Sequence, residues 1–225
     1  MPTARQAPAL DTVPPRSSAI VRLVDVVVDP AAAFRDIRAA HPWALALAAV
    51  ISLRFVSLLV FYDPVLTPLK VVASLGFQVA AVVPPLLLGS TLVWLAGKPW
   101  RLGASWSTVF SICAHVSVAY TLATIAFASV AGAMLPDSAS IDVRNPPFTN
   151  LAALVERSGS TALLHRLAAE VDVRSAYAAV LLWLGLRAAG EPGPHRDVGA
   201  AAVSTVATVA FIRVAAITAL ALVRG

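Results

Sequence analysis

The chain has 225 residues, of which 59% are hydrophobic and 13% are charged, and its mean hydropathy is +0.81. Soluble domains contain about 25% charged residues, so this composition argues against an ordinary soluble domain and is typical of a membrane protein. The formal net charge is +5, but the basic residues are scattered between apolar runs, which argues against a nucleic-acid-binding patch. The single cysteine, Cys113, excludes an internal disulfide.

Residues 1–18 are rich in proline and small polar residues, and we expect them to form a disordered cytoplasmic tail because they have little apolar surface to bury. Residues 19–41 are predicted to be amphipathic and to form two short helices. Ile20, Val24 and Val27 make an apolar stripe on the first, and Pro30 opens the second. Two placements fit such a segment: an interfacial pair lying on the membrane, or a hairpin packed on the cytoplasmic ends of a helix bundle.

Residues 42–225 are predicted to form the membrane domain of an all-α, polytopic membrane protein. A helix of about 20 residues crosses the roughly 30 Å hydrocarbon core. Apolar runs predict a bundle of five transmembrane helices, at about 43–62, 71–95, 106–128, 173–189 and 198–223. The long outer loop, residues 136–171, is predicted to carry two short amphipathic helices.

Lysine and arginine residues are more frequent on the side of the N-terminal tail than on the opposite side. The positive-inside rule therefore predicts a cytoplasmic N-terminus and an outside C-terminus. Arginine far outnumbers lysine and alanine is abundant, which is typical of a GC-rich bacterial genome. We thus expect a multi-pass protein of the bacterial cytoplasmic (inner) membrane.

Three polar side chains inside the spans, Arg54, Gln78 and Arg213, are predicted to lie at comparable depth in the outer half of the membrane. The five spans contain no aspartate or glutamate, and a cation at membrane depth costs roughly 2.5–3.5 kcal/mol. In one interpretation Arg54 and Arg213 line a site for an anionic group such as a lipid phosphate. In the other, each reaches a carboxylate near the interface, such as Asp172, or backbone carbonyls.

The second span contains the pair Pro84 and Pro85. Each proline removes a backbone donor and clashes with the carbonyl four residues before it, so a kink is predicted there.

The third span is the most polar, and Ser111 and His115 share one of its faces because they are four residues apart. His115 is interpreted as a hydrogen-bonding residue between helices, or else as a metal ligand or proton carrier. An intramembrane enzyme would require His115 to meet a nucleophile and a loop carboxylate. The sequence shows no metalloprotease motif and no phosphate-binding glycine loop, so no catalytic residue, metal site or cofactor is predicted.

Three segments carry a family resemblance: DPAAAFRDIRAAHPWALALAAV at 29–50, GKPWRLGASWSTVFSICAHVSVAY at 97–120, and DVRSAYAAVLLWLGLRAAG at 172–190. Together they resemble the Yip family of Rab/Ypt-interacting membrane proteins, in its bacterial branch. Asp172, Ser175, Leu184 and Gly185 fit the family's fourth-span signature, whereas Arg174 stands in place of an aromatic residue and Tyr177 in place of a tryptophan.

The resemblance implies a five-span bundle with a cytosolic N-terminus and no catalytic residues. Eukaryotic relatives bind Rab-type GTPases, a role that does not transfer to bacteria, which largely lack that machinery. The leading hypothesis is a non-enzymatic membrane protein that acts in membrane organisation through lipid or protein contacts. Its expected partners are the bilayer, an anionic lipid, another protein or a second copy of the chain. The alternative is a transporter or channel subunit with a path between the second and third spans.

Overall fold

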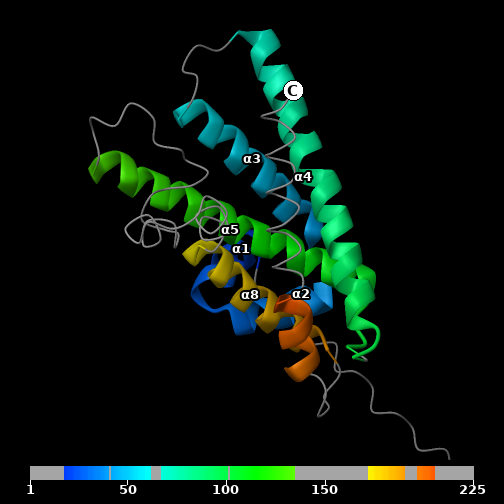
Figure 1. Ribbon diagram of the computed structural model, residues 1–225. Helices are drawn as coiled ribbons and strands as arrows, with labels where there is room; N and C mark the ends of the chain where they lie inside the picture. The colour runs from blue at the N-terminus through cyan, green and yellow to red at the C-terminus, as the bar shows by residue number, and fades with distance from the viewer. Residues whose placement is uncertain are drawn as a thin grey trace, which may run out of the picture.

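The computed structural model describes residues 18–40, 42–61, 67–100, 102–134, 172–190 and 197–205, and all regular secondary structure in these residues is helical (Figure 1). The helices are α1 (Ala19–Val28), α2 (Pro30–Ala40), α3 (Trp43–Phe61), α4 (Pro68–Gly97), α5 (Trp106–Met134) and α8 (Val173–Ala189). Residues 197–205 are helical as well. The prediction of an all-α chain is confirmed for this part of the protein.

Side-chain caps fix the starts of most of the described helices. The hydroxyl of Ser18 accepts a hydrogen bond from the Val21 amide at 3.3 Å, and the hydroxyl of Thr67 accepts one from the Lys70 amide at 3.3 Å. The Asp172 carboxylate caps α8 in the same way. These bonds satisfy amide donors that have no partner within the first turn of a helix.

Helix α5 is the centre of the bundle, with α3 and α4 on one side and α1, α2 and α8 on the other (Figure 1). One apolar cluster joins α5 to α2 and α8, and its fully buried members include Phe34, Ile37, Ile112, Leu181 and Leu186. A second cluster joins α5 to α3 and α4, and it consists of Ala46, Val50, Val82, Ala114 and Val118.

The two N-terminal helices pack differently. The buried side chains Phe34 and Ile37 hold α2 against α8 and α5. Helix α1 contacts α2 and α5 and buries Arg22 and Val26, whereas Ile20, Val24 and Val28 are exposed. Both placements of residues 19–41, on the membrane surface or on the cytoplasmic ends of a helix bundle, stay predictions. Residues 1–17 of the predicted tail and the outer loop 136–171 lie outside the described residues.

Two helices in the described part of the chain are long and apolar enough to cross a membrane: α4, and α5 over Trp106–Val130. The apolar run of α3, Trp43–Leu59, is shorter. Helix α8 has 17 residues, which gives about 25 Å and falls short of the roughly 30 Å hydrocarbon core. Most of the predicted fifth span lies outside the described residues. The five-span bundle therefore remains a proposal.

Helix α4 runs without interruption through Pro84 and Pro85, whose side chains are both exposed. The kink that these prolines predict stays a prediction.

Gly185 allows the closest approach between helices. A Cβ atom at this position would lie 2.5 Å from Cγ2 of Ile112 on α5 and 3.2 Å from the ring of Phe34 on α2. The contact with Ile112 is shorter than real Cβ atoms allow and the contact with Phe34 is tight. The absence of a side chain at residue 185 therefore lets α2, α5 and α8 come this close.

We predict that Gly185→Ala lowers the free energy of unfolding by about 1–3 kcal/mol, the usual cost of overpacking a filled core. Gly89→Ala on α4 is the matched control, because a Cβ there meets nothing within 4 Å. Thermal unfolding of the two purified variants in detergent checks this. Equal melting temperatures for both variants would contradict the packing described here.

Candidate functional site: a polar layer at the middle of α5

Buried polar side chains gather around the middle of α5. We define the polar layer as Arg22 of α1, Ser111, His115 and Tyr120 of α5, and Asp172 and Arg174 at the start of α8. All are buried except Tyr120, which is half-buried. Tyr120 is the central residue of α5. A polar cluster at this position is enclosed by packed helices on several sides.

The Asp172 carboxylate performs two tasks. Its Oδ1 accepts a hydrogen bond from the Ser175 amide, which caps α8, and its Oδ2 accepts one from Nε of Arg174 at 2.7 Å. Nη2 of Arg174 contacts the same oxygen, and the two side chains are only 5% and 3% exposed. An ion pair this deeply buried is stable only when its geometry is good and its atoms make further hydrogen bonds. The cap supplies one such bond, from the Ser175 amide to Oδ1 of Asp172.

Tyr120 connects this ion pair to two other helices. Its ring centroid lies 5.8 Å from the guanidinium carbon of Arg174, and its hydroxyl shares a side-chain hydrogen bond with Ser175. Arg54 of α3 lies close enough to interact electrostatically with the same tyrosine. Tyr120 therefore contacts α8 directly and lies within electrostatic range of Arg54 on α3.

His115 lies nearer the N-terminus of α5. Its Nδ1 is 2.7 Å from the carbonyl oxygen of Ser111, and because a carbonyl only accepts, Nδ1 carries the proton. Arg22 of α1 lies within electrostatic reach of His115. The Ser111 hydroxyl is buried and has no hydrogen-bond partner among the described residues. The histidine thus bonds the backbone of its own helix rather than the serine hydroxyl, which is not the arrangement of a base with its nucleophile.

The predicted site residues are distributed as follows. Arg54 is half-buried beside Tyr120, and Asp172 lies near the same ring but pairs with Arg174. Gln78 is buried on α4, one turn before Val82 of the second apolar cluster. Arg213 lies outside the described residues, so a joint site with Arg54 stays a prediction.

Arg22, Tyr120 and Arg174 were not predicted as site residues from the sequence. Helix α8 runs along the N-terminal half of α5 (Figure 1), since Ser175 meets Tyr120 while Gly185 meets Ile112. The Asp172–Arg174 pair consequently lies level with the middle of α5 and not at its end. The only local signal was the capping pattern at the start of α8. Among the described residues, no group of three or more histidine, cysteine or acidic side chains could hold a metal ion.

We predict that Asp172→Asn lowers the free energy of unfolding by about 3–5 kcal/mol, because asparagine still caps a helix but leaves the buried Arg174 guanidinium without its carboxylate. The matched control is Asp197→Asn, since Asp197 pairs with Arg187 at 2.9 Å with both side chains about half exposed. An exposed pair contributes about 0–1 kcal/mol. Thermal unfolding that shows the same loss for both variants would contradict the burial of the Asp172–Arg174 pair.

Comparisons of the chain with protein-family models, with curated proteins and with solved structures found no match. The resemblance to the Yip family therefore stays a prediction, and the function has to be argued from the residues and contacts of this chain.

Proposed function

We propose that the chain is a multi-pass integral membrane protein of the Yip-like class that acts through lipid and protein contacts and carries out no catalysis. The observation that carries this proposal is the uncovered surface of α4. Only 11% of its apolar window is buried, against 56% for α5. The large apolar side chains exposed along α4 are Leu69, Val72, Leu75, Phe77, Val79, Leu87, Leu88, Leu92 and Leu95.

This surface is unfavourable in water. Leaving one large apolar side chain in water instead of burying it forfeits about 1.5–3 kcal/mol. Soluble monomers rarely expose a contiguous apolar patch larger than a few hundred Å². Lipid chains solvate the same surface without that cost, so a bilayer is the environment that fits α4.

One end of the bundle has the composition of a membrane interface. Trp106 stacks on Phe110 at 5.1 Å between ring centroids, Trp43 meets the same ring at 5.7 Å, and Trp106 Nε1 donates to the Thr91 hydroxyl at 3.1 Å. Tryptophan is enriched at the level of lipid headgroups. These contacts bring the starts of α3 and α5 and the end of α4 to one level.

Basic side chains lie at the same end. Arg38 of α2 donates to the Ala188 carbonyl at 3.3 Å, Lys98 follows α4, and Arg187 lies near the end of α8. Under the positive-inside rule this end faces the cytoplasm. The arrangement supports the proposed topology in the bacterial cytoplasmic membrane, with a cytoplasmic N-terminus.

The contacts of the polar layer favour a role in helix packing over chemistry. Asp172 caps a helix and pairs with Arg174, and His115 bonds the backbone of its own helix. Between α4 and α5, Val82, Ala114 and Val118 are buried in a single cluster. Because this cluster fills the space between α4 and α5, it favours a function through lipid or protein contacts over a transport path between these two helices.

The two lysines of the sequence test the topology, because Lys70 and Lys98 lie at opposite ends of α4 and are both exposed. In a Cys113→Ala background, we expect a membrane-impermeant maleimide added to intact bacterial spheroplasts to label Lys70→Cys. Lys98→Cys should react only after permeabilisation. Labelling of both positions from outside, or recovery of the protein in the soluble fraction, would overturn the proposed function.

A further inference from the structure

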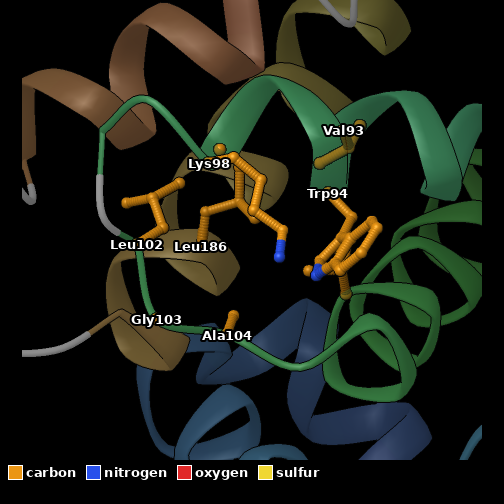
Figure 2. Close-up of a pocket in the computed structure, with 9 residues that line it drawn as sticks. Val93, Trp94, Lys98, Leu102, Gly103, Ala104 and Leu186 are labelled. Carbon is orange, nitrogen blue, oxygen red and sulfur yellow. The ribbon is translucent and has the colours of Figure 1, made fainter.

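A cavity of about 270 Å³ lies where α4 ends and the chain turns toward α5. Its wall is mainly apolar, formed by Val93, Leu102 and Val109 together with Leu186 of α8. Lys98 and Trp94 also line it, and Figure 2 shows the Lys98 side chain directed toward the Trp94 ring. The cavity thus combines an apolar interior with one ammonium group.

Two glycines shape the wall. A Cβ at Gly97 would come to 3.0 Å of Cδ1 of Leu102, and the Leu102 amide donates to the Gly97 carbonyl at 3.3 Å to close the turn. Gly103 has a φ of 66°, a left-handed conformation that glycine adopts readily. This tight turn places Leu102 and Ala104 opposite the end of α4, with the cavity between them.

The cation is held at a defined place. Nζ of Lys98 lies 4.1 Å from the centroid of the Trp94 ring, while the lysine side chain as a whole is exposed. A cation over an aromatic face is attracted by the ring quadrupole. This attraction favours a position of the ammonium beside the cavity, where it can still bind an anion.

The position of the cavity favours a lipid as its ligand. Leu92 and Leu95 are exposed on α4 close to Trp94, so the cavity adjoins the surface that we assign to lipid. A volume of about 270 Å³ is enough for a segment of an acyl chain but not for a whole lipid. A single lysine near a membrane surface attracts anionic lipid with an energy equivalent to about a fivefold change in affinity.

We propose that this cavity binds an anionic phospholipid of the cytoplasmic leaflet, with a segment of one acyl chain against Leu102, Val109 and Leu186 and the phosphate on Lys98. This inference rests on the proposed membrane function and adds to it a site and a ligand class. The site lies at the opposite end of the membrane from the one predicted for Arg54 and Arg213.

The test uses the full chain in nanodiscs that contain phosphatidylglycerol or phosphatidylcholine with brominated acyl chains, since bromine quenches nearby tryptophan fluorescence. The chain has five tryptophans, so the signal of Trp94 is taken as the difference between the parent protein and Trp94→Phe. We expect phosphatidylglycerol to quench Trp94 at about fivefold lower mole fraction than phosphatidylcholine.

Matched variants separate charge from volume. Lys98→Gln should remove the preference for phosphatidylglycerol, whereas Lys70→Gln, at the other end of α4, should keep it. Ala104→Phe should fill the cavity and lower the quenching of Trp94 by both lipids. The melting temperature of each variant shows that it is folded.

Equal quenching by the two lipids in the parent protein, or an unchanged preference in Lys98→Gln, overturns the lipid site. Either result leaves the proposed function standing if the maleimide labelling still places Lys70 and Lys98 on opposite sides of the membrane. Failure of that labelling pattern overturns the proposed function itself, so the two failures are distinguishable.

Discussion

Burial of the polar middle of α5 is the constraint on which the rest of the described structure depends. Ser111, His115 and Tyr120 lie on the helix that all the other labelled helices contact, and buried polar groups are costly unless they are hydrogen-bonded. Helices α1, α3 and α8 each bring an arginine to this level, and Asp172 pairs with the most deeply buried of the three. The position of α8 follows from this, because its N-cap has to lie beside Tyr120.

Helix α4 differs from α5 because most of its apolar surface is exposed instead of buried. Its narrow buried face, which includes Gln78, Val82, Ser90 and Val93, packs on the bundle, and most of its remaining apolar surface is uncovered. A closely packed core that contains buried polar contacts and an outer helix with an uncovered apolar surface are both typical of membrane proteins, in which apolar burial drives helix association less than polar contacts and close packing do. The lipid site that we propose at the end of α4 would add one defined binding position to this uncovered apolar surface.

The sequence predicted the positions of helices well, because periodicity, caps and prolines act locally. The fourth span was predicted at 173–189, and α8 occupies Val173–Ala189; α2 begins at Pro30 as expected. The position of α8 along α5 was not predictable, because no local sequence pattern indicates that Asp172 lies near Tyr120 in the middle of α5. In α1, Arg22 and Val26 are buried while Ile20 and Val24 are exposed. The buried side of α1 is set by its contacts with α2 and α5, and the contacts with α5 leave no local signal in the sequence.

The most direct test of the central claim, that α4 faces lipid, is a nitroxide scan along α4 in liposomes by electron paramagnetic resonance. The account predicts that labels at exposed positions such as Leu75, Leu88 and Leu92 collide often with oxygen and rarely with a water-soluble nickel complex. Labels at the buried positions Gln78 and Val82 should collide rarely with either. Frequent collision of the nickel complex with the labels at positions 75, 88 and 92 would show that α4 faces water and would contradict the account.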